Sequence, residues 1–215
     1  MKVAIAGGHG KIAMRLERLL AERGDSAVGL IRNPDQADDL REAGAEPVLC
    51  DLEADGDVAA AIEGADAVVF AAGAGPGSGS ERKRTMDLGG AVKLIEAAKQ
   101  AGISRYLIVS SMGAANPPAE GGGTFGEYLR AKAGADQALM QSGLDYTIVR
   151  PGHLTDGPAT GKVTIGNGLD SGEVSRADVA AVLLACLDDP RTAGIDFDLL
   201  EGETPIAGAL AAQGS

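Results

Sequence analysis

The stretch KVAIAGGHGKIA, residues 2–13, decides how this chain folds. Its apolar first half leads into a cluster of glycines, and an amphipathic segment follows over residues 11–23. This order predicts a buried parallel strand, a tight turn and a helix that opens beside the glycines. Gly7 permits the turn, Gly10 lets the backbone approach a phosphate, and Ala13 allows close packing of the helix. The free N–H groups and positive dipole of the helix start favour a pyrophosphate, although such turns also occur without a ligand.

The composition predicts one α/β domain that spans residues 1–215. Hydrophobic residues make up 45% of the chain and aromatic residues only 3%, so a large and mostly aliphatic core is expected. A formal net charge of −12 argues against binding to nucleic acid or to an anionic membrane. The basic run at residues 82–84 is expected to be a solvated helix start, with steering of an anionic cofactor as the alternative.

The cysteines and the start of the chain indicate a reducing compartment. Cys50 and Cys186 lie far apart and lack the spacing of a disulfide framework or a zinc site, so no metal is expected. Cys50 ends an apolar run and is expected to pack in the core. No secretion signal opens the chain, and no apolar run is long enough to span a membrane. A soluble cytoplasmic protein is therefore expected.

Strand-like and helix-like segments alternate along the chain. Strands are expected at 3–6, 27–31, 46–50, 67–70, 106–109, 146–149, 162–165 and 195–199. Helices are expected at 11–23, 35–43, 58–62, 85–100, 125–141 and 176–188, and flexible loops at 73–80 and 114–123. Such alternation gives parallel strands with right-handed crossovers and helices on both faces. The predicted fold is a doubly wound parallel sheet, a Rossmann fold, in a single domain with a small C-terminal region on the substrate side.

Polar or glycine-bearing segments follow most of the expected strands. They are the glycine turn, Arg32, Asp51-Leu52, Ala71-Ala72-Gly73, Ser110-Ser111 and Pro151-Gly152. In a doubly wound sheet the ligand lies beyond the C-terminal strand ends, so these segments converge on one crevice. Their convergence makes a nucleotide the expected ligand.

Arg32 indicates which dinucleotide the crevice takes. NAD-selective folds place Asp or Glu at the end of the second strand, about 20 residues past the glycines, to bind the ribose hydroxyls. Here that strand ends in Arg32-Asn33. A guanidinium binds a 2′-phosphate through two hydrogen bonds, and the acid that would repel the phosphate is missing. NADP(H) is therefore the expected cofactor; the alternative is a solvated arginine at a strand end.

These segments resemble an atypical short-chain dehydrogenase/reductase, of the single-domain NAD(P)H-binding group that includes NmrA-like and biliverdin/flavin-reductase-like proteins. The likeness covers nearly the whole chain, in the right order. The segments that carry it are Gly7-Gly8-His9-Gly10-Lys11-Ile12, Leu30-Ile31-Arg32-Asn33-Pro34, Asp51-Leu52, Ala71-Ala72-Gly73, Val109-Ser110-Ser111-Met112-Gly113, Tyr128 to Lys132, and Ser142 to Gly152.

The resemblance implies three groups of cofactor-binding residues. Those around the pyrophosphate and the 2′-phosphate are Gly7, His9, Gly10, Lys11, Ile12 and Arg32. Those beside the adenine and its ribose are Asp51, Leu52, Ala71, Ala72 and Gly73. Those at the nicotinamide end are Ser110, Lys132, Pro151, Gly152, His153 and Leu154.

Tyr128 and Lys132 form the candidate catalytic pair. At i, i+4 on a helix their side chains share one face, and a nearby ammonium stabilises a phenolate. Ser111, at the adjacent strand end, can hydrogen-bond a substrate carbonyl or developing alkoxide. The resemblance implies the same Ser–Tyr–Lys set, but the superfamily's usual asparagine has no match within residues 85–100. The alternatives are core packing for Tyr128, a solvated Lys132, and a loop cap for Ser111.

Four other residues carry simpler expectations. His153 would lie beside the substrate, either as an alternative proton donor or as a surface-loop histidine. Asp87 is expected only to stabilise the dipole at a helix start. Arg176 and Asp178 open a later helix and are expected to form a structural ion pair.

The expected function is hydride transfer from NADPH to a small carbonyl, quinone or flavin-like acceptor, with Tyr128 supplying the proton. Two alternatives stay open: an NmrA-like redox sensor that binds NADP(H) and signals through a partner, and a nucleotide-sugar epimerase. The Tyr–Lys pair favours an enzyme, whereas the missing asparagine and the short region after residue 150 favour the sensor. That short region also leaves little room for an epimerase's substrate domain. A small-molecule substrate and a monomer or homodimer are expected.

Overall fold

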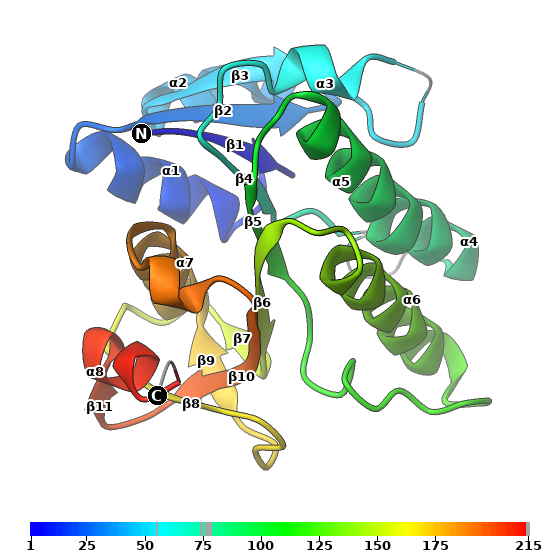
Figure 1. Ribbon diagram of the computed structural model, residues 1–215, viewed down its shortest axis with the longest axis vertical. Helices are drawn as coiled ribbons and strands as arrows, with labels where there is room; N and C mark the ends of the chain where they lie inside the picture. Colours follow the sequence, from blue (N-terminus) through cyan, green and yellow to red (C-terminus); the bar gives the residue numbers. More distant parts are fainter. Residues whose placement is uncertain (55, 74, 76–78, 214–215) are drawn as a thin grey trace.

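A nine-stranded sheet with helices on both faces forms the centre of the protein (Figure 1). The computed structural model describes residues 1–54, 56–73, 75 and 79–213. The strands lie in the order β11-β8-β10-β6-β5-β4-β1-β2-β3, and each neighbouring pair from β3 to β10 is parallel. The chain runs outward from β1 in one direction and from β4 in the other. This reversal opens a crevice beyond the strand ends, and the predicted doubly wound fold is confirmed.

The bounds of the elements agree closely with the predicted segments up to residue 151. The strands of the large sheet are β1 (Lys2–Ala6), β2 (Ser26–Ile31), β3 (Ala45–Leu49), β4 (Ala67–Phe70), β5 (Arg105–Val109), β6 (Asp145–Pro151), β8 (Lys162–Gly166), β10 (Ile195–Glu201) and β11 (Thr204–Pro205). The helices are α1 (Ala13–Glu22), η1 (Pro34–Gln36), α2 (Ala37–Glu42), α3 (Val58–Ala61), α4 (Ser80–Arg82), η2 (Lys83–Gly90), α5 (Ala91–Gln100), α6 (Gly123–Met140), α7 (Arg176–Asp188), η3 (Pro190–Thr192) and α8 (Ile206–Ala211). None of the helices in the described ranges is long and apolar enough to cross a membrane.

Strand β1 shows why the first stretch is apolar without interruption. Val3 and Ile5 pack in the same core cluster as α1 and α7, whereas Ala4 and Ala6 pack with α5 and α6 on the opposite face. Helices cover both faces of the sheet, so all four side chains are buried. Because β1 pairs with β2 and β4, the glycine turn that follows it lies at the middle of the C-terminal edge.

The helix predicted at residues 85–100 begins differently. A single turn, α4, precedes it, and its first part, η2, is a π-helix rather than an α-helix. Met86 and Asp87 on η2 are buried, so this widened segment turns both side chains inward. Wide π turns are common near functional sites. Of the flexible loop predicted at 73–80, residues 74 and 76–78 lie outside the described residues.

The C-terminal region contains more structure than its sequence predicts. A second, two-stranded sheet pairs β7 (His153–Thr155) with β9 (Glu173–Ser175). The strand predicted at 195–199 is not the last, because β11 and α8 follow it. Strand β8 runs antiparallel to its neighbours β10 and β11, so the sheet is only mostly parallel. Strands β7, β9 and β11 are only two or three residues long, too short for their sequence to show a hydrophobic period.

Glu17 is an acid inside the core. It lies on the face of α1 that packs on β2, where a Cβ on Gly29 would come within 2.8 Å of its Oε1. Its side chain is fully buried, and neither carboxyl oxygen has a hydrogen-bond partner in the described part of the chain. Burial raises the pKa of Glu17 to about 8, so at neutral pH the folded protein holds this carboxyl protonated.

Replacing Glu17 with methionine should therefore remove a pH-dependent loss from the free energy of unfolding. The unfolded chain loses the Glu17 proton near pH 4.5 and the folded protein near pH 8, so the stability of the wild type falls as pH rises through this window. The gain from Glu17→Met should be about 3–4 kcal/mol larger at pH 8 than at pH 4.5. Urea denaturation across this range measures it, with exposed Glu22→Gln as the control. Parallel pH profiles for Glu17→Met and wild type would rule the assignment out.

Candidate nucleotide-binding site

The strand ends of one half of the sheet line a cavity of about 310 Å³. It lies beyond β1, β2, β3 and β4, at the crevice that the strand order predicts. The cofactor-binding residues of the sequence analysis that line it are Gly7, His9, Gly10, Arg32, Asp51, Leu52, Ala71, Ala72 and Gly73. The structure therefore brings together residues from four separate parts of the chain, in one cavity.

The glycine turn beside the first cavity leaves no room for a side chain at Gly7 or Gly10. Gly7 has a φ of +78°, and a Cβ there would come within 2.7 Å of the Ala72 Cα. A Cβ on Gly10 would come within 2.9 Å of the Gly7 carbonyl oxygen. Ala13 is fully buried under the start of α1. The predicted reasons for the turn at Gly7 and for close packing at Ala13 agree with this geometry.

The start of α1 offers backbone donors at the same place. In the described part of the chain the N–H groups of Lys11 and Ile12 have no protein acceptor, whereas the Gly10 N–H donates to the Gly7 carbonyl oxygen at 2.7 Å. Unpaired N–H groups at the positive end of a helix fit a pyrophosphate. Neither side chain lines the first cavity, so Lys11 and Ile12 can take part only through their backbone in this geometry.

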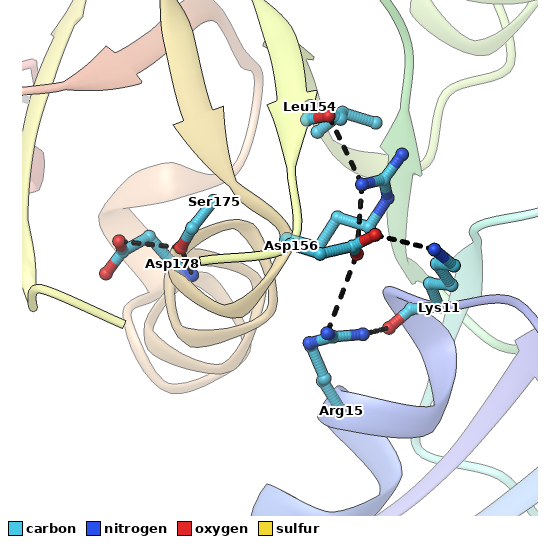
Figure 2. Close-up of polar contacts among 7 residues, drawn as sticks. Lys11, Arg15, Leu154, Asp156, Ser175 and Asp178 are labelled. Atoms are coloured by element: carbon cyan, nitrogen blue, oxygen red, sulfur yellow. Dashed lines mark hydrogen bonds and ion pairs between the residues drawn. The ribbon is translucent and has the colours of Figure 1, made fainter. Parts of the chain in front are cut away.

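The Lys11 side chain points instead to Asp156, as Figure 2 shows. Its Nζ lies 2.6 Å from the Asp156 carboxylate, which also meets Arg176 at 3.0 Å and Arg15 at 3.7 Å. The hydrogen bond from Lys11, followed by the charge of Arg176, lowers the pKa of Asp156. The cluster ties α1 to the start of α7, which joins the nucleotide half of the fold to the C-terminal region.

The expected ion pair between Arg176 and Asp178 is therefore wrong. Arg176 pairs with Asp156, whereas the Asp178 carboxylate accepts a hydrogen bond from the Ser175 hydroxyl at 2.8 Å, and the Asp178 N–H donates to the same hydroxyl at 2.9 Å (Figure 2). Further donors to Asp178 are the Thr160 and Gly161 N–H groups, at 3.0 and 2.8 Å. Side chains two residues apart on a helix point in different directions, so each of these two has its own partner.

Arg32 and His9 stand at the outer edge of the first cavity. Arg32 is half exposed, and its Nη1 lies 3.5 Å from Glu53 Oε2. His9 Nε2 lies 2.6 Å from the Asp39 carboxylate. Cys50 packs against the hydrophobic core as expected, but it is only half-buried and also lines the cavity, because β3 ends one residue before it. Burial still raises the pKa of the Cys50 thiol.

A second cavity of about 560 Å³ lies beyond β5 and β6. Seven site residues that the sequence predicts line this second cavity: Ser110, Ser111, Tyr128, Pro151, Gly152, His153 and Leu154. Because β4 and β5 are neighbours in the sheet, the strands that end at the two cavities lie side by side. The nicotinamide end predicted for these residues thus lies next to the predicted adenine and ribose end.

Lys132 is buried beneath Tyr128. Its Nζ donates to the Val109 carbonyl oxygen at 3.1 Å, lies 3.3 Å from Asp87 Oδ1, and lies 5.9 Å from the centre of the Tyr128 ring. The shared helix face predicted for the pair is thus present, and a solvated Lys132 is excluded by its burial. Asp87 does more than stabilise a helix dipole: it is fully buried and forms an ion pair with Lys132.

The rim of the second cavity is aromatic and basic. The Phe125 and Tyr128 rings stack with centroids 6.0 Å apart, and Lys83 Nζ lies 5.9 Å from the Tyr128 ring centre. Ser111 is half-buried, with its hydroxyl 3.3 Å from the Met112 carbonyl oxygen. The neighbouring Ser110 is buried next to Asp136. Burial raises the pKa of Asp136, and the charge of Arg150 and the Ser110 hydroxyl partly offset this rise.

Several lining residues are not predicted by the sequence. In the first cavity they are Leu30, Ile31, Gln36, Cys50 and Met86, whereas Arg82 belongs to the basic run for which steering of an anionic cofactor is the alternative prediction. In the second cavity they are Met112, Gly113, Phe125, Ser171, Gly172 and Arg176. Most are apolar or glycine and carry no chemical signal, but Arg176 could have been found as a charge at the start of a helix. Among the described residues no group of three or more His, Cys, Asp or Glu is placed to hold a metal ion.

Comparison with known proteins also indicates binding of a nicotinamide dinucleotide. The profile of an NAD(P)H-binding family matches residues 7–190. YhfK of Bacillus subtilis (strain 168), named an uncharacterized sugar epimerase, is 43% identical over 212 residues, which are 98% of this chain and 99% of YhfK. A solved structure from Bacillus halodurans, provisionally named an NAD-dependent epimerase/dehydratase, is 40% identical, covers 99% of both chains and superposes with a TM-score of 0.92.

A third similar protein is a named reductase. ChuY of Escherichia coli O157:H7, an anaerobillin reductase, is 30% identical to this chain. The match covers 94% of this chain and 97% of ChuY, with a TM-score of 0.80. The glycine turn, the open backbone donors of α1 and the profile over residues 7–190 lead to one conclusion. The chain belongs to the NAD(P)H-binding family.

Proposed function

We propose that this protein is an NADPH-dependent oxidoreductase that reduces a small carbonyl, quinone or flavin-like acceptor. The observation that carries the proposal is the pairing of two cavities at neighbouring strand ends. The first has the backbone cradle and the arginine that suit NADP(H), and the second holds Tyr128 above a buried lysine. The name of the similar ChuY, a reductase, supports the same reaction class.

In such a reaction each residue at the second cavity has a separate role. NADPH, when bound, supplies the hydride. The Tyr128 hydroxyl donates the proton to the reduced acceptor, and the Lys132 ammonium below the ring stabilises the phenolate that remains. Ser111 donates a hydrogen bond to the acceptor oxygen, where negative charge develops. The exposed Phe125 ring stacks on the Tyr128 ring and supports its position.

Arg32 should set the preference for NADPH over NADH. Replacing it with alanine removes a charged donor to the 2′-phosphate, which NADH lacks, so NADPH binding should weaken about 10- to 100-fold while NADH binding changes less than about twofold. Titration of the protein with each dinucleotide, followed by nicotinamide fluorescence, measures both constants. Arg41→Ala, on exposed α2 outside the cavity, is the control. Equal losses for both dinucleotides would exclude contact with the 2′-phosphate.

The reaction itself is tested with a panel of quinones, flavins and aldehydes, by following the near-ultraviolet absorbance of NADPH. Turnover of at least one acceptor, with tighter binding of NADPH than of NADH, is the expected result. Binding of NADPH without reduction of any acceptor would favour the redox sensor instead.

A nucleotide-sugar epimerase is the second candidate, because YhfK and the Bacillus halodurans protein carry epimerase names. An epimerase returns the hydride to its substrate, so it would interconvert nucleotide sugars with no net loss of NADPH absorbance. The region after β6 argues against it, since β7, β8 and β9 are three to five residues long and form no separate domain.

A further inference from the structure

Arg82 differs from the other two members of the basic run at residues 82–84. It lines the first cavity, and its Nε is buried, whereas Arg84 is exposed and lies away from that cavity. Lys83 points elsewhere again, since its Nζ donates to the Thr124 carbonyl oxygen. One cation of the run is therefore turned toward the nucleotide cavity, and a solvated helix start does not account for it.

Arg82 and Arg32 meet at one carboxylate. Arg82 Nε and Arg32 Nη1 each lie 3.5 Å from Glu53 Oε2, so these two nitrogens are at most 7.0 Å apart. The Glu53 side chain is held in place, because the Thr85 hydroxyl donates to its other oxygen at 2.5 Å. Residues from the end of β2 and the end of α4 are thus brought together by a fixed acid.

Glu53 pairs with both arginines but does not line the first cavity. Arg32 and Arg82 both line it. In the described part of the chain Glu53 is the one acid that either guanidinium pairs with, and neither makes a hydrogen bond there. Two guanidinium groups share one carboxylate, so both have donors left over that a dianion at the cavity edge would engage.

We propose that Arg82 is the second cation of the 2′-phosphate site and that Arg32 and Arg82 together select NADP(H). The inference rests on the NADP(H) preference in the proposed function. A phosphate monoester carries a charge of about −1.5 to −2 at pH 7 and has three acceptor oxygens, enough for two planar guanidinium forks. A ribose hydroxyl, as in NADH, has neither the charge nor the acceptors to engage both.

The test uses two fragments of the cofactor, so it does not depend on any acceptor. Binding of adenosine 2′,5′-bisphosphate and of adenosine 5′-monophosphate is measured by calorimetry for wild type, Arg82→Gln, Arg82→Lys, Arg32→Gln and the control Arg84→Gln. Arg82→Gln should weaken the bisphosphate about tenfold or more and the monophosphate less than about twofold. Arg82→Lys should fall between wild type and Arg82→Gln, because it keeps the charge but loses the fork. Arg84→Gln, with the same change of charge, should leave both fragments within about twofold.

The outcomes separate this inference from the proposed function. A wild type that does not prefer the bisphosphate overturns both the NADP(H) preference and the role of Arg82. A preference that is lost in Arg32→Gln but kept in Arg82→Gln overturns the role of Arg82 alone. Equal weakening of both fragments by Arg82→Gln also overturns it, and the melting temperature of Arg82→Gln shows whether a change in folding is the cause.

Discussion

Replacing Lys132 with methionine should lower the free energy of unfolding by about 3–5 kcal/mol. Lys132 and Asp87 are both buried, with Nζ and Oδ1 3.3 Å apart, and the lysine also donates to a backbone carbonyl oxygen. Methionine fills much of the same volume but leaves the Asp87 carboxylate inside the core without its cation. Removing one partner of a buried ion pair is among the most costly single changes in a protein. Urea denaturation of wild type and variant measures the loss.

A second substitution separates charge from packing. The double variant Lys132→Met/Asp87→Leu removes both charges, so it should regain at least half of the lost stability. If Lys132 acts only by filling space, the double variant will be no more stable than Lys132→Met. The stability of the single variant Asp87→Asn should lie between those of Lys132→Met and the double variant. Asparagine keeps a polar partner for the Lys132 ammonium but carries no charge.

Replacing Tyr128 with phenylalanine should lower kcat about 10²- to 10⁴-fold, the range that positioned acid catalysis contributes. The ring remains to stack on Phe125 and to cover Lys132, so only the proton-donating hydroxyl is lost. Binding of NADPH should change less than about twofold. Steady-state kinetics with the best acceptor of the panel, beside a separate titration of NADPH, measure both effects.

Tyr146→Phe is the matched control for this change, because Tyr146 is half-buried on β6 and lines neither cavity. Its kcat should stay within about twofold of the wild type. If Tyr128→Phe keeps full activity, Tyr128 is not the proton donor. His153, which lines the same cavity, is then the group to replace next.

Much of the fold follows from local pattern. Buried strands such as β1 are apolar on both faces, and glycines follow where the chain must turn. Parallel pairing then places the ends of β1 to β4 at one edge, so the sequence alone suffices to assign Arg32, Asp51 and Ala71 to one cavity. These predictions need only periodicity and topology, which short-range sequence carries.

The directions of long side chains cannot be predicted in the same way. The resemblance implies that Lys11 lies at the pyrophosphate, but its flexible side chain reaches Asp156, 145 residues away along the chain. From local sequence Asp87 is predicted to be an acid at a helix start. Nothing in that sequence reveals that a π-helical segment turns its side chain toward Lys132. Partners distant in sequence decide such contacts, and their identity emerges only from tertiary packing.

A crystal structure of the protein with NADP⁺ tests the proposed cofactor site most directly. We expect the pyrophosphate at the backbone N–H groups of Lys11 and Ile12, and the 2′-phosphate at Arg32. The nicotinamide should lie in the second cavity, beside Tyr128 and Ser111. A dinucleotide with its nicotinamide turned away from Tyr128, or with its 2′-phosphate distant from Arg32, would show that the proposed site is wrong.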